Sequence, residues 1–249
     1  MPQVTHVFKT YFPQTAGGLE EGIRQCATYA AAREFEVKVV CVGPADAQVT
    51  SPEGITTRFY KKTVDAFSNP FSFSFARAFS SICRQTDLLH FHFPWPTAEI
   101  LALVHDVKKP ALVTFHCDIH KFMPVKKMYL PLIRRFLQKM DCICVTSWPL
   151  FHNTAYLAPF IHKTQQVSLF MDEQRFAGLG PADPELVTFA RNKNFALFVG
   201  VLRWYKGLDI LLDAARTTAG DILIVGTGPL YEKLQSRIKK ENLTNVYLL

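Results

Sequence analysis

The chain lacks the features of a membrane-spanning or exported protein. Its 249 residues contain no apolar run of about 18 residues or more, the length that a helix needs to cross a bilayer. The N-terminal segment MPQVTHVFKTYFP has neither a long apolar core nor a small-residue cleavage site, so it does not fit a signal peptide. These absences predict a cytoplasmic protein, whose 6 cysteines are expected to be reduced thiols.

Metal-binding patterns are also missing. Cys142 and Cys144 have no second C-x-x-C pair, so the sequence does not predict a zinc site. His90 and His92 share one face of an expected strand, but a metal site would need a third ligand that the sequence does not place. We interpret these two histidines as packing residues or as support for a nearby site, and we expect no bound metal.

The motifs of two common ligand classes are absent. There is no G-x-G-x-x-G, and Cys41-Val42-Gly43-Pro44 follows the expected second strand where a dinucleotide-binding fold carries an acidic residue. This excludes a nicotinamide fingerprint. No zinc finger, RNP pattern or helix-turn-helix signature is present, so nucleic acid is not an expected partner. The net charge of +7 nevertheless favours an anionic partner, such as a phosphorylated metabolite or an anionic membrane surface.

Strand-like and helix-like segments alternate along the first two thirds of the chain. This alternation predicts an α/β fold with a mostly parallel sheet covered on both faces. The expected strands are Val4–Phe8, Val37–Val42, Thr56–Tyr60, Leu88–His92, Ala111–Phe115, Cys142–Thr146 and Gln166–Leu169. The expected helices are Leu19–Arg33, Phe73–Gln85, Thr97–Val107 and Lys126–Met140.

A stretch rich in Gly, Pro and Asp, Met171–Pro184, predicts a connector between two lobes. We therefore expect a first domain over residues 1–170, a connector over 171–194 and a second strand–helix series over 195–249. The second series ends on the strand-like residues NVYLL, and a sheet of so few strands would leave an apolar face uncovered. The expectation is that the sequence stops inside its second domain, as a fragment or with another chain completing the lobe.

The most informative segment is FALFVGVLRWYKG, residues 195–207. Its apolar run predicts a buried parallel strand that ends at Gly200. Arg203 and Lys206 follow, at the carboxyl edge of the sheet, where open α/β folds bind ligands. Two cations three residues apart suit a diphosphate, because ionised donors make the strongest hydrogen bonds to phosphate oxygens. The segment predicts an enzyme that uses a nucleoside diphosphate.

Two glycine pairs follow other expected strands. Gly17 and Gly18 open an expected helix, where free N–H groups and the helix dipole favour an anion, but they are equally well a plain loop. Gly226 and Gly228, in the sequence GTGP, form a turn that can also lie under a nucleotide. His116 ends the strand ALVTFH, and its place favours a role in ligand binding over a merely structural one.

Residues 121–140, KFMPVKKMYLPLIRRFLQKM, are basic and contain no acidic residue. Apolar residues recur through the stretch at helical spacing, so it predicts an amphipathic helix. Such a helix can lie on an anionic membrane surface. The alternative is a helix that faces the core and exposes a solvated basic side, and both interpretations remain open.

Taken together, these motifs resemble the retaining glycosyltransferases of family four, which have a GT-B fold of two facing Rossmann-like domains. The resemblance spans nearly the whole chain and rests on HVFKTYFPQTAGGLEEGI, LLHFHFPWPTAEI, VTFHCDIH, FVGVLRWYKGLDILLDA and ILIVGTGPL, in that order. The forms HVFKTYFP, HFHFPWP and VLRWYKG are most similar to bacterial mannosyl- or rhamnosyltransferases that build lipopolysaccharide O-antigen from GDP-sugars.

The resemblance assigns roles to the residues singled out above. It implies that Gly17 and Gly18 lie near the donor phosphates, that His116 contacts the transferred sugar, and that Arg203 and Lys206 neutralise the leaving diphosphate. It also implies GDP-mannose as donor, no required metal, and a polyprenyl-diphosphate-linked glycan as acceptor. A protein of this kind would work at the cytoplasmic face of the inner membrane.

The chain departs from the family pattern in two places. The C-terminal E-x7-E motif has no counterpart, and Phe170-Met171 stand before Asp172 where a small residue is usual. We therefore expect low activity from this chain alone. Two other hypotheses stay open: a non-catalytic product that binds membrane or partner enzymes, and another GT-B enzyme of sugar nucleotides, such as an epimerase.

Overall fold

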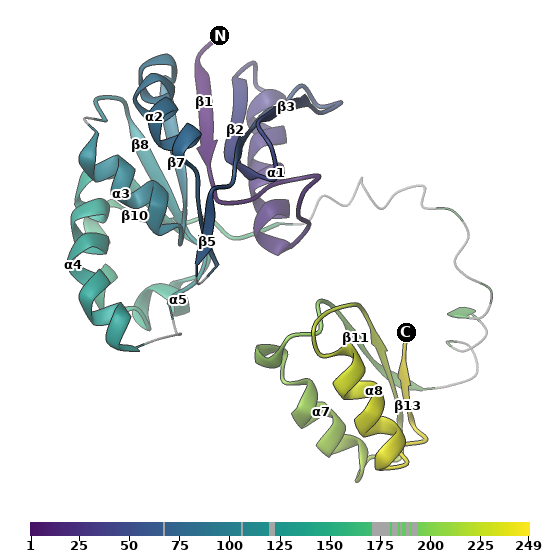
Figure 1. Ribbon diagram of the computed structural model, residues 1–249. Coiled ribbons are helices and arrows are strands. Elements are labelled where there is room, and N and C mark those ends of the chain that lie inside the picture. The colour runs from purple at the N-terminus through teal and green to yellow at the C-terminus, as the bar shows by residue number, and fades with distance from the viewer. Residues whose placement is uncertain are drawn as a thin grey trace. The chain divides into compact units, whose positions relative to one another are not determined.

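The computed structural model describes residues 1–66, 68–105, 107–119, 123–170 and 194–249, together with the single residues 180, 184, 186, 187 and 190; residues 123–127 are described by their backbone alone. The chain forms two compact units, Met1–Asp172 and Glu173–Leu249 (Figure 1). The connector predicted over residues 171–194, including Met171, lies almost entirely outside the described residues. Among the described residues, no helix has the length and apolar character that a bilayer crossing requires.

The first unit is built on an eight-stranded sheet in the order β10-β9-β8-β7-β1-β2-β4-β3. Every pair of neighbours is parallel except β3 and β4. The strands are β1 (Gln3–Val7), β2 (Glu36–Gly43), β3 (Ala47–Thr50), β4 (Thr56–Lys61), β7 (Leu88–Phe93), β8 (Ala111–Phe115), β9 (Cys142–Val145) and β10 (Thr164–Gln166). This arrangement confirms the α/β fold class.

The strand order changes direction at β1. From β1 the chain moves outward to β2 and β4, and it then returns to the other side of β1 to form β7, β8 and β9. In an open parallel sheet, the loops after the two strands at such a switch point run to opposite sides and leave a crevice at the carboxyl edge. The ends of β1 and β7 therefore mark where this unit can take a ligand.

Helices cover both faces of the sheet because the strands alternate apolar side chains between the two. On one face, Ile23 and Ala27 of α1 (Gly18–Ala31) pack with Phe8, Val39 and other apolar residues. The opposite face carries the larger, aromatic-rich core. Its elements include α2 (Phe73–Gln85), α3 (Pro96–Val104), α4 (Met123–Lys139), α5 (Trp148–His152) and the 3-10 helix η1 (Ala155–Lys163). A short hairpin, β5 (Val64–Ala66) with β6 (Asn69–Phe71), stands outside the main sheet.

The second unit has three parallel strands in the order β11-β12-β13. Its elements are β11 (Phe195–Val199), the 3-10 helix η3 (Trp204–Lys206), α7 (Leu208–Ala215), β12 (Asp221–Val225), α8 (Tyr231–Lys240) and β13 (Val246–Leu248). One core joins the two helices to the sheet. The strand predicted before Gly200 is confirmed as parallel, but the prediction that it is buried is wrong: no residue of β11 is buried, and Leu197 and Val199 are 58% and 68% exposed, because one apolar face of this small sheet is uncovered.

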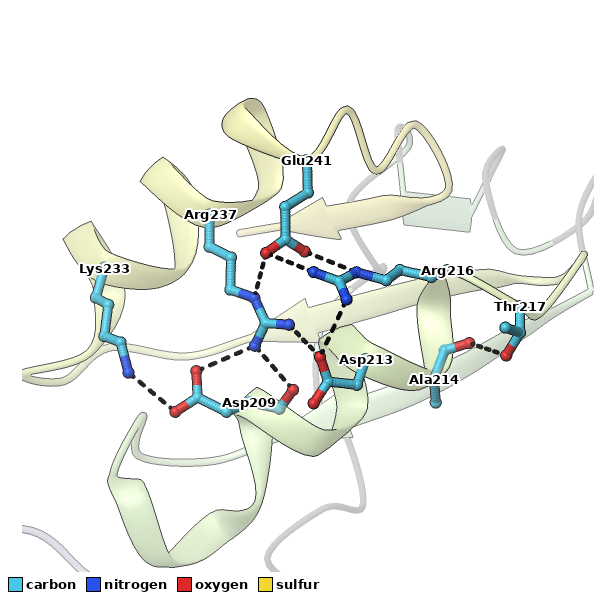
Figure 2. Close-up of polar contacts among 8 residues, drawn as sticks. All are labelled: Asp209, Asp213, Ala214, Arg216, Thr217, Lys233, Arg237 and Glu241. Atoms are coloured by element: carbon cyan, nitrogen blue, oxygen red, sulfur yellow. Dashed lines mark hydrogen bonds and ion pairs between the residues drawn. The ribbon is translucent and has the colours of Figure 1, made fainter.

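An ion-pair network ties α7 to α8 on the outside of the second unit (Figure 2). Arg237 of α8 lies at its centre, where it pairs with Asp209, Asp213 and Glu241. Arg216 joins the network from just after α7 through Glu241. Because one guanidinium serves three carboxylates, the network fixes the angle between the two helices more firmly than separate surface pairs would.

Some predicted elements differ from the structure. The last strand of the first unit was predicted at Gln166–Leu169, but β10 is Thr164–Gln166. The Val167 N–H still donates to the Val145 carbonyl at 2.9 Å, after which the chain leaves the sheet and Leu169 is 53% exposed. The prediction was based on the apolar residues Val167 and Leu169, but the strand ends at Gln166. The sequence reading also missed β3, the β5–β6 hairpin, α5 and η1.

Candidate active site

His116 lies directly after β8, at the carboxyl edge of the first unit's sheet. Its backbone N–H donates to the Phe93 carbonyl of β7 at 3.4 Å, which keeps the two strand ends together. On the α1 side, its ring lies close to Gly22, where a Cβ would come 4.0 Å from His116 Cε1. The structure therefore places His116 beside the switch point, where the sequence predicted a ligand-facing residue.

A row of histidines extends from His116 into the sheet. His92 Nδ1 is 3.0 Å from His116 Nε2, and His6 Nδ1 is 3.0 Å from His92 Nε2. His90 lies beside them and shares a 2.7 Å hydrogen bond with Thr114 through its Nε2 atom. The ring nitrogens His6 Nε2 and His116 Nδ1 are buried and have no partner among the described residues.

These histidines are neutral at physiological pH. Burial lowers the pKa of His6 to about 4. It also lowers the pKa of His116 to about 4, although the Glu20 charge opposes the shift. Burial holds the pKa of His90 and of His92 well below the usual range, and the neighbouring histidines lower it further.

His6 is the third histidine that the sequence reading could not place. His6, His90 and His92 each bring a possible ligand atom within 4.8 Å of the others. His6 Nδ1 and His92 Nε2, however, already contact each other at 3.0 Å, and His90 Nε2 contacts Thr114 at 2.7 Å. These ring nitrogens thus have partners within the row, and we interpret the row as a set of hydrogen-bonded rings.

The glycine pair lies at the start of α1. Gly17 is the extended N-cap residue, with φ −172° and ψ 175°, and Gly18 is the first helical residue. Glu20 in the first turn accepts hydrogen bonds from Thr10 at 2.9 Å and Thr15 at 2.8 Å. A Cβ at Gly17 would come 2.8 Å from Glu20 Oε2, whereas nothing lies within 4 Å of one at Gly18.

Glu20 is a residue that the sequence reading missed. It sits at a helix N-terminus, where a negative charge is stabilised, and its charge acts on His116. The two hydroxyl donors that hold it come from the loop between β1 and α1, so the carboxylate is fixed in place. This end of α1 thus presents a carboxylate together with its free N–H groups, which makes it less suited to a diphosphate than the glycines alone suggest.

The loop after His116 is fixed by Asp118. Its Oδ1 atom accepts a hydrogen bond from the hydroxyl of Tyr156 at 2.6 Å and another from the Ile119 N–H at 2.7 Å. Burial raises the pKa of Tyr156 above its usual range, and the Asp118 contact raises it further. The loop that carries His116 is thereby tied to η1.

In the second unit, the two predicted cations follow β11. Arg203 is the extended N-cap residue of η3, and Lys206 is its last residue. Gly207 then takes up the left-handed conformation at φ 72°, which starts α7. Arg203 and Lys206 are exposed, and among the described residues neither has a carboxylate partner. The carboxyl edge of this sheet therefore presents two exposed positive charges.

Gly226 and Gly228 hold this loop in position. A Cβ at Gly226 would lie 2.0 Å from the Gly200 carbonyl oxygen, and one at Gly228 would lie 2.7 Å from Leu202 N and O. Both glycines also have φ near +150°, a region that side chains disfavour. Backbone hydrogen bonds from Gly200 to Val225 and from Leu202 to Thr227, 3.0 and 2.9 Å long, bind the two loops together.

The basic stretch over residues 121–140 forms α4, whose side chains are described from residue 128 onward. Ile133, Phe136 and Leu137 are fully buried, so one side of the helix faces the core. Arg134 and Arg135 lie on the exposed side. Lys121 lies outside the described residues. The amphipathic helix is confirmed, and its basic side is free for solvent or an anionic partner.

The family called Glycosyltransferase Family 4 matches residues 16–152, more than half of the chain. The chain belongs to this family. It is 31% identical over 250 residues to the D-rhamnosyltransferase WbpZ of Pseudomonas aeruginosa, with 99% of the chain and 65% of the relative covered. It is 33% identical over 248 residues to the O-antigen chain mannosyltransferase C of Escherichia coli, with 98% and 66% covered. The chain thus spans just under two thirds of the length of these relatives.

Solved structures share the fold of this family 4 chain. Sucrose-phosphate synthase from Thermosynechococcus elongatus is similar with a TM-score of 0.73 at 16% identity, covering 100% of the chain and 70% of that structure. Anabaena HepE in complex with UDP has a TM-score of 0.70 at 13% identity, covering 100% and 69%. At such low identity the likeness establishes the fold, and it confirms the predicted GT-B class.

Proposed function

We propose that the protein is a glycosyltransferase of cell-surface polysaccharide synthesis. It transfers mannose, or a related sugar such as rhamnose, from a GDP-sugar to a lipid-linked saccharide and retains the anomeric configuration. Family membership supports the reaction class, and the named activities of the Pseudomonas and Escherichia relatives support the sugar and the pathway. The choice of GDP rests on the resemblance of HVFKTYFP, HFHFPWP and VLRWYKG to enzymes of that kind.

The observation that carries the proposal is the pair of exposed cations after β11. When the glycosidic bond to the donor breaks, negative charge develops on the leaving diphosphate. Arg203 and Lys206 supply fixed positive charge for it, and positioned cations of this kind are a large contribution to catalysis. Because two cations serve the diphosphate, the proposed reaction requires no metal.

His116 is the proposed contact to the transferred sugar. It lies beside the switch point of the first unit and, being neutral, can donate or accept one hydrogen bond without placing a full charge beside the sugar. Gly17 and Gly18 allow a donor to approach the backbone at the start of α1, in the neighbourhood of Glu20.

The proposed acceptor, a polyprenyl-diphosphate-linked glycan, places the enzyme on the cytoplasmic side of the inner membrane. The exposed basic side of α4 supports contact with an anionic surface. A cavity of about 510 Å³ beside it is lined by Arg134, His162 and Lys163 together with Gln138, Pro159 and Phe160. Arg134 and Lys163 in this lining place further positive charge on that side of the first unit.

Donor binding tests the central part of the proposal. Calorimetric titration of the chain with GDP, UDP and GDP-mannose should show selective binding of the guanine nucleotides. Arg203→Ala and Lys206→Ala should each weaken GDP binding by about tenfold or more, the effect of one charge-assisted hydrogen bond. Lys240→Ala, an exposed lysine on α8, is the matched control and should bind as the wild type does. Unchanged affinity in both variants contradicts the diphosphate role, and preference for UDP contradicts the GDP donor.

A transfer assay tests the reaction itself. GDP-mannose and a polyprenyl-diphosphate-linked saccharide should yield a longer saccharide, and NMR of the new linkage should show the donor's anomeric configuration. An isomerised or free sugar formed without acceptor would instead indicate another sugar-nucleotide enzyme.

A vesicle flotation assay tests the proposed membrane contact. The fraction of protein that floats with anionic vesicles should fall for the double variant Arg134→Glu with Arg135→Glu, but not for Lys239→Glu with Lys240→Glu. Vesicle binding by a chain that binds no nucleotide would favour the non-catalytic alternative.

A further inference from the structure

The face of the first sheet that α1 covers carries four histidines from three neighbouring strands. His6 lies on β1, His90 and His92 lie on β7, and His116 follows β8. The parallel register places His6 beside His90 and His92 beside Thr114. The side chains of His6, His90 and His92 are only 1%, 8% and 3% exposed. The proposed function uses His116 alone and leaves the other three unexplained.

Three of the four form a continuous chain of hydrogen bonds. His6 Nδ1 meets His92 Nε2, and His92 Nδ1 meets His116 Nε2, each at 3.0 Å. Every contact joins the Nδ1 atom of one ring to the Nε2 atom of the next. The chain ends at His6 Nε2 inside the protein and at His116 Nδ1 near the carboxyl edge, and neither end atom has a protein partner among the described residues.

A neutral imidazole carries one N–H and one lone pair, so the three rings cannot choose their tautomers independently. Each contact needs one donor and one acceptor. Only two arrangements satisfy both contacts: all three rings protonated on Nδ1, or all three protonated on Nε2. A tautomer change at either end therefore requires the same change in every ring.

The buried end of the chain decides between the two arrangements. Protonation on Nε2 would leave an N–H of His6 buried without an acceptor, and unpaired buried donors are rarer in proteins than unpaired acceptors. Protonation on Nδ1 leaves only a lone pair at His6 and moves the unpaired N–H to His116 Nδ1, which is also buried but belongs to a partly exposed residue at the sheet edge, where a bound ligand can accept from it. The second arrangement is therefore the one whose unpaired N–H a ligand at the sheet edge can satisfy.

We propose that His6 and His92 are positioning residues that hold His116 in the Nδ1–H tautomer, so that it donates a hydrogen bond to an oxygen of the bound sugar. The inference rests on the proposed function for the identity of that oxygen, but the chain of tautomers is a property of the protein alone. A sugar hydroxyl, whose oxygen can accept a hydrogen bond, would be favoured over a group that can only donate.

The tautomers can be measured directly on the unmodified chain. With ¹⁵N-labelled histidine, long-range ¹H–¹⁵N spectra distinguish a protonated ring nitrogen from an unprotonated one. His6, His92 and His116 should each carry the proton on Nδ1. A wild-type His116 that carries it on Nε2 overturns the proposal without any variant.

Two variants break the chain at different points. His92→Gln retains an amide near the Nε2 position but removes the link to His116, and His6→Gln removes the link at the far end. In both, the preference of His116 for Nδ1–H should weaken by about tenfold, the effect of one neutral hydrogen bond. His90→Gln is the matched control, because His90 stacks on His92 at 4.2 Å but bonds to Thr114 and not to the chain. The His116 tautomer should be unchanged in this control.

The outcomes separate this inference from the proposed function. If His92→Gln and His6→Gln leave the tautomer of His116 unchanged in folded protein, the chain does not control it and the proposal fails. If the tautomer shifts while sugar transfer keeps its rate, the positioning role in the reaction fails although the hydrogen-bond chain is real. Stoichiometric binding of added Zn²⁺ that His90→Gln abolishes would show a metal site in place of the chain, and would also overturn the proposal.

Discussion

At the residue scale, Gly226 is required by the packing of two loops, whatever it contributes to a ligand site. A side chain there would meet the Gly200 carbonyl, and the backbone has φ 151°. The turn after β12 and the loop that carries Arg203 therefore lie in backbone contact. The sequence reading gave this turn a possible place under a nucleotide, and the structure adds the role of holding the cationic loop.

This packing predicts the effect of Gly226→Ala. The substitution adds strain on the order of 1–3 kcal/mol from the backbone conformation alone, and the contact with Gly200 adds to it. We expect faster hydrogen exchange in β11 and β12, and GDP binding weakened together with stability. Gly220→Ala is the control, because its Cβ would meet only Thr218 Cγ2 at 3.8 Å and its φ is not positive. Equal exchange in the two variants would contradict the argument.

At the scale of single elements, α2 shows how burial on one helix face supports the first unit. Phe75 is fully buried, stacks on Trp95 at 5.0 Å and meets Phe79 at 5.6 Å. Phe73, two residues earlier on the same helix, is 61% exposed. Phe75→Ala should lower the free energy of unfolding by about 3–5 kcal/mol in urea titration. Phe73→Ala should cost far less, and similar losses for the two would mean that α2 does not pack as described.

The α7–α8 network makes a prediction of another kind. Arg237→Ala removes the guanidinium that three carboxylates share, whereas Lys233→Ala removes a single exposed pair with Asp209. The Arg237 variant should unfold at a lower temperature than the Lys233 variant at low salt. The difference should shrink as salt is raised, because salt screens exposed charges. A salt-independent difference would point to lost side-chain packing instead.

The sequence predicted elements with strong local patterns and missed those that depend on their surroundings. The apolar run before Gly200 and the run ending at His116 identify parallel strands and the residues at their ends, although only the second of these strands is buried. Ala47–Thr50 was missed because its sequence AQVT alternates apolar and polar residues over only four positions, three of which are exposed; only pairing with β4 makes it a strand. Local patterns therefore located most of the parallel strands, but not the antiparallel edge strand.

The histidine chain could not be predicted for a related reason. His90 and His92 are visibly on one strand face, but His6 joins them only because β1 and β7 are neighbours in the sheet. That neighbourhood follows from the strand order, which the local pattern of neither segment contains. Glu20 was missed because its contact with Thr10 and Thr15 depends on the path of the loop after β1.

At the scale of the whole molecule, the buried histidines make stability depend on pH. His6 has a pKa of about 4 in the folded protein, against 6.5 for an exposed histidine. Between these values the unfolded chain binds more protons than the folded one. Lowering the pH from 6.5 to 4 therefore favours unfolding, and His6 alone accounts for about 3 kcal/mol of the loss.

Glu99 acts in the opposite direction and must be separated from this effect. Burial raises its pKa to about 8, although the Trp95 N–H donates to it at 2.9 Å. Because the folded protein binds the Glu99 proton more tightly, that carboxyl group adds stability as the pH falls from about 8 to 4.5. Glu99 is present in both the wild type and a His6 variant, so its contribution cancels in their difference.

The difference between His6→Gln and wild type therefore isolates the histidine. The variant loses stability at pH 7.5 because a buried contact is broken, but it no longer has a proton to gain on unfolding. Its disadvantage in urea titrations should shrink by about 3 kcal/mol as the pH is lowered from 6.5 toward 4. His152→Gln, at an exposed histidine on α5, should follow the wild type at every pH. A His6→Gln curve that stays parallel to the wild type would mean that His6 is already charged, or that its burial does not control its protonation. In that case His6 would not be the neutral ring that the proposed chain of tautomers from His6 to His116 requires.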